Sequence, residues 1–343
     1  MKVYAGMDPR MPLSEVVAHA TRIEALGYDG LHVAETIHDP FMVSLLALQA
    51  TTTLKVRTAV ALAFVRSPMI TALSSWDLSV ISGGRFELGL GTQIKQNIED
   101  RYGSPWGEPV KRMEDYVEAV RACFHSFQTG EPLNVTGSHY PLRRLQGYFN
   151  PGPSPEVQPP AIYLGGVNQK MTQLAGQVAD GFVTHPTNSS PKAVLTHCLP
   201  NLEIGLNNAG RSRVGFELVV GTQVITGVDD ERLDQERERQ RKLFAFLYST
   251  PAYARTLELY GWEHLVGELQ QLVRSDHWED LHDIVTDEVL DTLIPTGRVD
   301  HLSDLLLRRF GGFADGLTLS VPTDPALDEG LKTCIRELQG ATP

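Results

Sequence analysis

The sequence of 343 residues predicts a single (β/α)₈ TIM barrel of the α/β class, with its active site at the carboxyl ends of the strands. Three observations lead to this prediction. Short apolar runs alternate with helical patterns, one helix-to-strand junction occurs three times, and the number of apolar runs reaches eight. Periodicity does not show whether such a sheet closes, so an open, doubly wound sheet remains the alternative.

The repeated junction is a helix that ends at a glycine and leads directly into a strand. Apolar residues recur at helical spacing over residues 13–26, and Gly27 follows as a C-terminal cap would. A buried strand of a parallel sheet is predicted directly after it, at residues 31–34. The same exit occurs at residues 176–183 and 313–319, which indicates a repeated architecture.

The other strands are predicted from apolar runs that turn residues bound. The eight predicted strands lie at residues 3–5, 31–34, 54–62, 86–90, 161–164, 182–183, 216–225 and 317–319. Helical patterns fill most of the gaps, at residues 13–26, 69–81, 110–127, 171–178, 194–208 and 327–338. Because strands alternate with helices, we expect a parallel sheet.

Two segments interrupt the alternation and are interpreted as insertions in one domain that spans residues 1–343. Residues from about 129 to 160 contain seven prolines, which favours a long loop. Residues from about 229 to 300 are predicted to form extra helices. They begin with the run 236–242, whose acidic and basic side chains alternate, and we interpret this run as a solvated helix face.

Composition narrows the classes of function. Acidic residues outnumber basic ones by 42 to 30, so the chain lacks the basic balance that a nucleic-acid-binding protein needs. No stretch has the roughly 18 uninterrupted apolar residues of a membrane span, and the amino terminus lacks the features of a signal peptide. The three widely spaced cysteines favour neither a disulfide framework nor a zinc site. We therefore expect a cytoplasmic protein without a metal.

Polar side chains that follow strands are the first candidates for the site, because a barrel of this type holds its chemistry at that edge. Glu35 follows the second strand and is a candidate to polarise or deprotonate a bound group. His38 is a candidate for proton transfer near neutral pH. The alternative is that Glu35 caps local structure and His38 shapes a loop.

A second candidate region lies between the fifth strand and the next helix, at Gly165, Gly166, Val167 and Asn168. Backbone N–H groups at the start of a helix favour an anion, and glycines let a phosphate approach closely. A tight turn without a ligand is the alternative, and the chain has no GxGxxG dinucleotide motif after its first strand.

Several motifs resemble those of one known superfamily. The most specific is Ser82-Gly83-Gly84-Arg85, followed by an apolar strand that ends in Gly89-Leu90-Gly91. Further motifs are Gly27-Tyr28-Asp29-Gly30-Leu31, Arg57-Thr58-Ala59-Val60, Tyr163-Leu164-Gly165-Gly166 and Ala179-Asp180-Gly181-Phe182. Over nearly its whole length the chain resembles the luciferase-like monooxygenase superfamily, and most closely the branch that uses the 8-hydroxy-5-deazaflavin coenzyme F420.

The resemblance implies a homodimer of barrels in which the cofactor ring lies across the barrel mouth. Members often have a non-proline cis peptide in the third strand, which falls here between residues 59 and 60. The resemblance places the polar edge of the ring at residues 93 and 97, and the phosphate-bearing tail at residues 165–167. The residues expected to hold the cofactor are Glu35, Ala59, Val60, Gln93, Asn97, Gly165, Gly166, Val167, Asn168 and His185.

The implied activity is hydride transfer between the C5 carbon of the deazaflavin and a small organic substrate. Members of this branch commonly have a histidine directly after the acidic residue that ends the second strand, where this chain has Thr36. The candidate catalytic residues are therefore Glu35, Thr36 and His38, and the proton donor stays unassigned. We expect the substrate pocket to be partly aromatic, with Phe64, Tyr102 and Trp106.

The sequence is also compatible with other functions. The first alternative is a monooxygenase that uses reduced FMN and molecular oxygen on the same scaffold. A flavin-binding protein without turnover is a second alternative, because Thr36 stands where a histidine is common. A sugar-processing barrel is a third, although it needs paired carboxylates across a cleft and Glu35 has no evident partner in the sequence.

Overall fold

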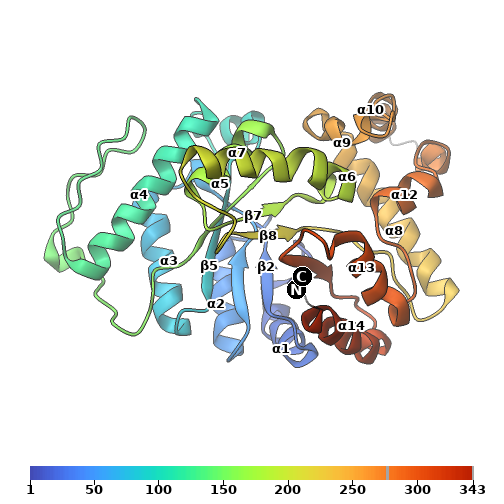
Figure 1. The fold of residues 1–343 in the computed structure, drawn as a ribbon, viewed down its shortest axis with the longest axis horizontal. Coiled ribbons are helices and arrows are strands. Elements are labelled where there is room, and N and C mark those ends of the chain that lie inside the picture. Colours follow the sequence, from blue (N-terminus) through green and yellow to red (C-terminus); the bar gives the residue numbers. More distant parts are fainter. Residues whose placement is uncertain (276–277, 342–343) are drawn as a thin grey trace. The chain divides into compact units, whose positions relative to one another are not determined.

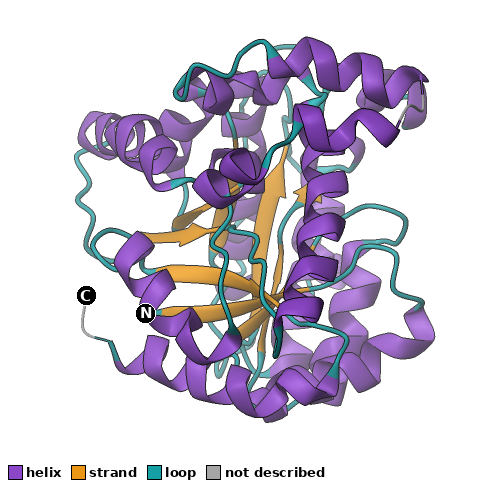
Figure 2. Cartoon of the chain, turned by 90° about the vertical axis from the view of Figure 1, so that its right-hand side faces the viewer, coloured by secondary structure: helices purple, strands orange, loops and turns teal. Residues whose placement is uncertain are grey.

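The computed structural model describes residues 1–275 and 278–341, and strands alternate with helices along this part of the chain. Figure 2 distinguishes its helices, strands and loops by colour. The strands are β1 (Lys2–Gly6), β2 (Gly30–Val33), β3 (Lys55–Thr58), β4 (Ala61–Leu62), β5 (Phe86–Gly91), β6 (Ile162–Gly166), β7 (Gly181–Thr184), β8 (Glu217–Val220) and β9 (Gly316–Ser320). Each of the eight predicted apolar runs therefore contains a strand.

The strand order in the sheet is β3-β2-β1-β9-β8-β7-β6-β5-β4. Because β3 also pairs with β5, the order closes into a ring of eight strands, and β4 is a short extra strand on β5. The pairings of β2 with β3, β5 with β6 and β8 with β9 are parallel. The predicted (β/α)₈ barrel is confirmed.

Two predicted strands were wrong in extent. The run 54–62 is divided into β3 and β4, with a cis peptide bond between Ala59 and Val60 in the gap. The run 216–225 ends as β8 at Val220, because the chain turns there and the Thr222 N–H donates back to the Val220 carbonyl at 2.9 Å.

Helices follow the strands. They are α1 (Val16–Leu26), α2 (Pro40–Ala50), α3 (Pro68–Ser82), α4 (Pro109–Thr129), α5 (Gln169–Val178), α6 (Pro191–Ala193), α7 (Leu199–Asn208), α8 (Asp230–Tyr248), α9 (Ala254–Glu258), α10 (Leu265–Ser275), α11 (Leu281–Ile284), α12 (Asp287–Leu293), α13 (Leu302–Phe310) and α14 (Asp328–Gly340). None of the described helices is long and apolar enough to cross a bilayer. Gly27 caps α1 with a φ of 89°, as its position predicts.

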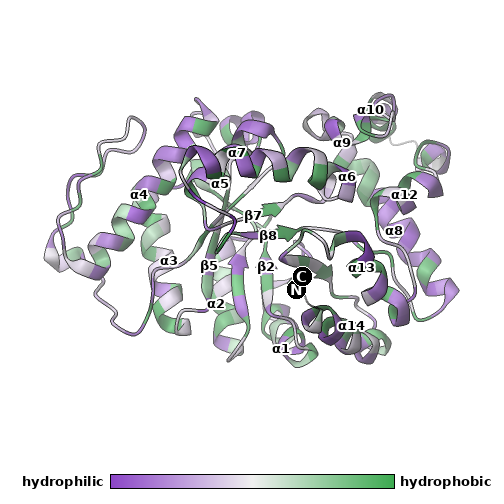
Figure 3. Cartoon of the chain, in the orientation of Figure 1, coloured by the Kyte–Doolittle hydropathy of each residue, from purple (hydrophilic) through white to green (hydrophobic). Residues whose placement is uncertain are grey.

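Sequence periodicity missed α2. Its residues are apolar on nearly every side (Figure 3), so the helix lacks the one-sided pattern by which an amphipathic helix is recognised. Asp39 caps its N-terminus and accepts from the N–H groups of Phe41 and Met42. The predicted helix at residues 194–208 begins with a π-helical turn at Val194–Cys198 before α7.

The chain divides into two compact units, which we call the N-terminal unit (residues 5–183 and 201–217) and the C-terminal unit (residues 1–4, 184–200 and 218–343). The prediction of one domain stays a prediction. In the N-terminal unit the Thr58 hydroxyl accepts from the Gly89 N–H at 2.9 Å and donates to the Gly89 carbonyl at 2.8 Å. A Cβ at position 89 would lie 1.9 Å from the Thr58 carbonyl oxygen, so only glycine allows β3 and β5 to approach this closely.

Residues 130–160 leave the end of α4 as an extended arm, which Figure 1 draws projecting beyond that helix. The base of the arm is anchored on α4, where Asp115 accepts from the Ser138 hydroxyl at 2.9 Å and Arg112 donates to the Tyr140 hydroxyl at 2.7 Å. Apart from the short 3₁₀ helix Gly147–Phe149 and one isolated bridge, the arm has no regular structure. The predicted long loop is confirmed.

In the C-terminal unit the predicted helical insertion contains α8 to α12. The prediction that residues 236–242 form a solvated face was wrong at Gln240 and Arg241, which are buried. Arg241 donates to the Val285 carbonyl and to Asp287, and these bonds satisfy its buried guanidinium.

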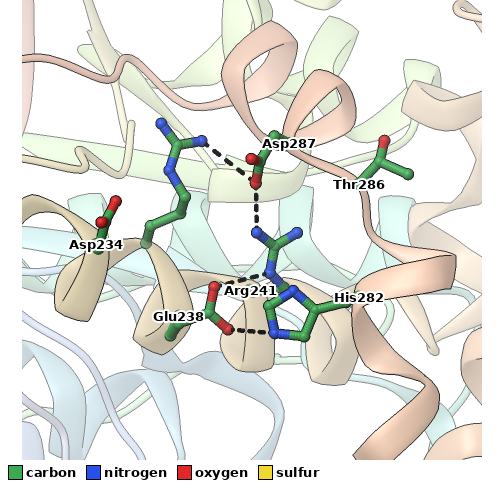
Figure 4. A pocket seen from close by; sticks show the side chains of 7 residues that line it. Asp234, Glu238, Arg241, His282, Thr286 and Asp287 are labelled. Carbon is green, nitrogen blue, oxygen red and sulfur yellow. Dashed lines mark hydrogen bonds and ion pairs between the residues drawn. The ribbon is translucent and has the colours of Figure 1, made fainter.

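The ionic groups around Arg241 line an open cavity of about 580 Å³ (Figure 4). His282 Nε2 lies 2.9 Å from Glu238 Oε2, and Arg237 lies 3.6 Å from Asp287. These pairs join α8 to α11 and α12. Because the charges pair with one another, the cluster has a structural role.

Candidate functional site

Two strands of the N-terminal unit, β5 and β6, bring their carboxyl ends against the side chain of Val60, which follows β3. A Cβ on Gly91, which ends β5, would lie 2.5 Å from Val60 Cγ2, and a Cβ on Gly165, in β6, would lie 2.9 Å from Val60 Cγ1. Both positions therefore favour glycine. We call Ala59, Val60, Gly91 and Gly165 the Val60 platform; the predicted cis peptide lies within it, between Ala59 and Val60.

Glu35 lies beside this platform and is held by the chain that forms it. Its backbone N–H donates to the Val60 carbonyl at 3.2 Å, and its Oε2 accepts from the Leu62 N–H at 2.7 Å and from Arg66 at 2.6 Å. The side chain is 6% exposed. Among the described residues, Oε1 of Glu35 has no hydrogen-bond partner, so this atom is available to a ligand.

Arg66 links two carboxylates at the strand ends. Besides Glu35 it donates to Asp39 Oδ2 at 2.8 Å. Burial alone would lower the pKa of Arg66, but its hydrogen bonds to Glu35 and Asp39 raise that pKa above its usual value. Arg66 therefore remains a cation that fixes Glu35 against the segment following the cis peptide.

The two other candidate catalytic residues, Thr36 and His38, differ in their hydrogen bonds. The Thr36 hydroxyl donates to the Pro9 carbonyl at 3.1 Å, and the Thr36 carbonyl accepts from Arg101 at 2.5 Å. His38 is half-buried in the loop between β2 and α2. No residue in the described part of the chain hydrogen-bonds its imidazole, so His38 is the less constrained of the two.

Gln93 follows β5 and adopts the left-handed conformation with a φ of 63°. It is the only residue other than glycine with a positive φ in the part of the chain that the structure describes. Its side-chain carbonyl accepts from the Ile94 N–H at 3.0 Å. Such conformations occur preferentially at functional sites, because only a demanding local environment maintains them.

Asn97 begins a π-helical turn, Asn97–Arg101, a few residues further on. The Asn97 carbonyl accepts from the Tyr102 N–H at 3.2 Å, which closes this turn. Single π-helical turns are frequent at functional sites. Both residues predicted to meet the polar edge of a ring, Gln93 and Asn97, thus lie in unusual backbone after β5.

The predicted phosphate-binding segment connects β6 to α5. Asn168 is the N-cap of α5. Its side-chain oxygen accepts from the Met171 N–H at 3.0 Å and so caps the helix. Gly165, Gly166 and Val167 are half-buried. The first backbone N–H groups of α5 have no partner within the helix, which makes this end of α5 suited to an anion.

His185 belongs to the C-terminal unit and follows β7. Its Nδ1 accepts from the Thr187 N–H at 3.3 Å and lies 2.8 Å from the Thr187 hydroxyl. The proton of the neutral ring is therefore on Nε2. Burial lowers the pKa of His185 to about 4, so the residue is an uncharged donor at neutral pH. Its role at a cofactor stays a prediction.

Two of the three predicted substrate residues contact each other, and their role at a substrate stays a prediction. Phe64 is buried, with its ring 5.8 Å from that of Trp106 and the Arg112 guanidinium 4.3 Å from its centroid. Arg112 also donates to the Trp106 carbonyl at 2.6 Å. The ring of Tyr102 contacts Arg101, whose guanidinium lies 5.0 Å from the ring centroid.

Sequence reasoning missed the basic residues that organise this region. Arg101 donates to the Thr36 carbonyl, 65 residues away, and Arg112 to the Phe64 carbonyl, 48 residues away. No local motif marks such a bond. Tyr253, whose ring stacks on His185 at 4.6 Å, comes from the insertion and was also missed.

Comparisons with known proteins show which family this chain is similar to. The model of the luciferase-like monooxygenase family matches residues 2–315. An uncharacterized protein of Mycobacterium tuberculosis is 40% identical over 312 residues, which cover 90% of this chain and 91% of the relative. The 5,10-methylenetetrahydromethanopterin reductase of Archaeoglobus fulgidus is 29% identical over 309 residues, 88% of this chain and 87% of the relative.

Among solved structures, the coenzyme F420-dependent tetrahydromethanopterin reductase of Methanopyrus kandleri has the same fold. It aligns with a TM-score of 0.80 at 18% identity and covers 98% of each chain. The chain therefore belongs to the luciferase-like monooxygenase family of flavin- and deazaflavin-dependent oxidoreductases.

Proposed function

We propose that this protein is a coenzyme F420-dependent oxidoreductase that transfers hydride between the C5 carbon of the deazaflavin and a small organic substrate. The observation that carries the proposal is the Val60 platform next to the N-terminus of α5. A planar ring needs a flat apolar support, and three of the four platform residues have no side chain larger than a methyl group. A phosphate-bearing tail needs N–H donors, which the start of α5 supplies.

The chain's own groups fit a ring held at this place. Glu35 Oε1 is available to accept a hydrogen bond, and the unusual backbone at Gln93 and Asn97 presents amide groups after β5. The bound deazaflavin would supply the hydride chemistry, whereas the protein supplies position and electrostatics.

We propose His38 as the residue that moves the proton. Glu35 Oε2 is bound to Arg66 and Leu62, and the Thr36 hydroxyl is bound to Pro9. His38 is half-buried and lacks a hydrogen-bond partner among the described residues, so its ring nitrogens are free to contact a substrate oxygen. It would thereby replace the histidine that the branch commonly has at position 36.

The names of relatives favour the deazaflavin over FMN. The Methanopyrus kandleri reductase is named as dependent on coenzyme F420, and a further relative, at 29% identity over 318 residues, is a putative coenzyme F420-dependent oxidoreductase of Mycobacterium tuberculosis. The alternative remains a monooxygenase that uses reduced FMN and O₂, because the family contains such enzymes and the platform would support either ring.

The proposal is tested by anaerobic incubation of the protein with oxidised coenzyme F420 and a panel of alcohols and hemiacetals, following loss of the deazaflavin absorbance. Turnover in this assay, without oxygen uptake when reduced FMN is supplied, supports hydride transfer. Oxygen uptake with reduced FMN and no turnover of F420 would establish the alternative.

A variant tests the phosphate end of the site. Val167→Glu places a carboxylate beside the start of α5 and should weaken binding of F420 and FMN alike, because both carry phosphate. Gly166→Glu is less suitable, since a Cβ at position 166 would lie 2.8 Å from Met171 Cγ. Unchanged affinity in Val167→Glu would move the phosphate elsewhere.

We also propose that the protein is a homodimer, as the resemblance implies. Met42 at the start of α2 and Ile70 at the start of α3 are exposed apolar residues, and an interface that buries them supports this proposal.

A further inference from the structure

The outer part of the arm exposes aromatic and basic side chains together. Tyr148 is 92% exposed and Phe149 is 61% exposed, and their rings pack edge to face at 5.2 Å. Arg143 and Arg144 are also exposed and form no ion pair with any described residue. We call residues 141–149 the arm tip; it contains these two arginines and no carboxylate, in a chain of net charge −12.

The arm tip is held in place from both sides. On the outgoing side the His139 N–H donates to Asp115 at 3.0 Å, and on the return side the Asn150 side chain donates to the Ser126 carbonyl at 2.9 Å. Both acceptors belong to α4. A surface that is presented in one conformation loses less entropy when it binds, so the tip is suited to recognition.

A surface of complementary character lies on α3 in the same unit. Ile70 and Ile81 are 56% and 54% exposed, and Val80 is also exposed. Between them stands Asp77, an exposed carboxylate without an ion pair to any described residue. Partial desolvation by its neighbours raises the pKa of Asp77, and no basic group offsets this effect. We call these four residues the α3 face.

The arm and α3 lie at the same edge of the N-terminal unit (Figure 1). The return side of the arm passes the end of α3, where the Ser79 hydroxyl donates to the Gln158 carbonyl at 3.4 Å. In a two-fold symmetric dimer, if one patch of the first copy contacts another patch of the second copy, the same contact also forms with the copies exchanged. A tip with two arginines and two aromatic rings matches a face with a carboxylate and three aliphatic side chains.

We propose that the arm tip of one copy packs on the α3 face of a second copy, and that this exchange stabilises the dimer. The arginines pair with Asp77, and the rings of Tyr148 and Phe149 cover the aliphatic residues. The inference rests on the proposed homodimer but is independent of the cofactor. An anionic membrane is a poorer partner, because the net charge of −12 opposes its approach.

Sedimentation velocity of the full-length protein tests the exchange through a charge swap. Arg143→Asp/Arg144→Asp and, separately, Asp77→Lys should each weaken self-association by about 30-fold, the effect of losing a central interface contact. The combined triple variant restores opposite charges and should recover much of the loss. Val214→Ser, which removes a side chain that is also exposed but lies outside both patches, is the control and should leave self-association unchanged.

Cross-linking locates the contact. The three native cysteines are buried, so Tyr148→Cys introduces an accessible thiol for a benzophenone maleimide. With a mixture of ¹⁵N-labelled and unlabelled chains, the expected product joins residue 148 of one isotope to a peptide of α3 of the other. Cross-links within one copy only would overturn the proposal.

Two outcomes of sedimentation velocity would overturn the exchange. A monomeric wild-type protein overturns the exchange and the dimer together. A wild-type dimer that persists in both charge variants overturns the exchange and leaves the dimer standing. Cofactor titration of the same samples shows whether the variants remain folded, and it separates failure of the exchange from failure of the proposed function.

Discussion

The imidazole of His185 lies flat against the phenol ring of Tyr253, with ring centroids 4.6 Å apart and an interplanar angle of 17°. The stack joins the end of β7 to the helical insertion within the C-terminal unit. A second bond supports it, in which the Tyr248 hydroxyl donates to the Thr187 carbonyl at 2.9 Å. The insertion therefore covers the half-buried His185 ring and keeps it neutral.

The burial of His185 predicts a dependence of stability on pH. Its pKa is about 4 in the folded protein and 6.5 in the unfolded reference, so the unfolded chain binds more protons between these values. The free energy of unfolding should fall as the pH drops from 6.5 toward 4, by at most about 3 kcal/mol from this residue, and should not depend on it above 6.5.

Urea unfolding of wild type and His185→Gln over this pH range checks the sign. The difference in free energy between the two proteins should shift in favour of the variant as the pH falls. His264→Gln, at an exposed histidine, is the control for the loss of an imidazole elsewhere in the same unit. A constant difference between wild type and His185→Gln would show that His185 titrates normally in the folded protein.

Gln93→Gly should stabilise the protein by up to about 1 kcal/mol, because glycine adopts the left-handed conformation without the steric cost that a Cβ causes. The same variant should bind the cofactor more weakly, since it lacks the carboxamide. Gln93→Ala removes the carboxamide but keeps the steric cost, so it should lose affinity without gaining stability. Denaturant unfolding and cofactor titration measure both effects, and a destabilised Gln93→Gly would show that the conformation carries no strain.

Arg66→Met should reduce the free energy of unfolding by about 2–4 kcal/mol, because it leaves the buried Glu35 carboxylate without its charged partner. Asp39→Asn is the matched variant. It retains an N-cap for α2 and removes only a half-exposed pair, so it should cost less than about 1 kcal/mol. Equal losses in the two variants would contradict the role of Arg66 as the anchor of Glu35.

His38→Gln should lower kcat for hydride transfer by about 10²–10⁴-fold, the usual contribution of a general acid or base, with cofactor affinity unchanged. Thr36→Val removes a hydroxyl that is already bound to Pro9 and should lower kcat much less. Stopped-flow measurement of the reductive half-reaction separates chemistry from binding. A larger loss in Thr36→Val than in His38→Gln would reverse the assignment.

Local patterns in the sequence were sufficient to locate the strands, although not the ends of two of them. Each predicted apolar run contains a strand, since buried parallel strands are continuous apolar segments that turn residues bound. The same reasoning failed for α2, where apolar residues on nearly all sides remove the helical period. It also failed for Arg241, whose charge is buried through partners about 45 residues away.

The site was predictable only in part, because a motif names residues but not their partners. The cis bond at Ala59–Val60 follows from the resemblance and is present. The anchoring of Glu35 by Arg66 depends on residues 31 positions apart, and the burial of Phe64 depends on Arg112 and Trp106. No spacing rule links such residues before the chain is folded.

The most direct measurement of the proposed function is calorimetric titration of the apo-protein with coenzyme F420 and, in the same buffer and salt, with FMN. The proposal predicts micromolar or tighter binding of F420 and binding of FMN at least about tenfold weaker, a difference of about 1.4 kcal/mol. Tighter binding of FMN, or binding of neither cofactor, would contradict it.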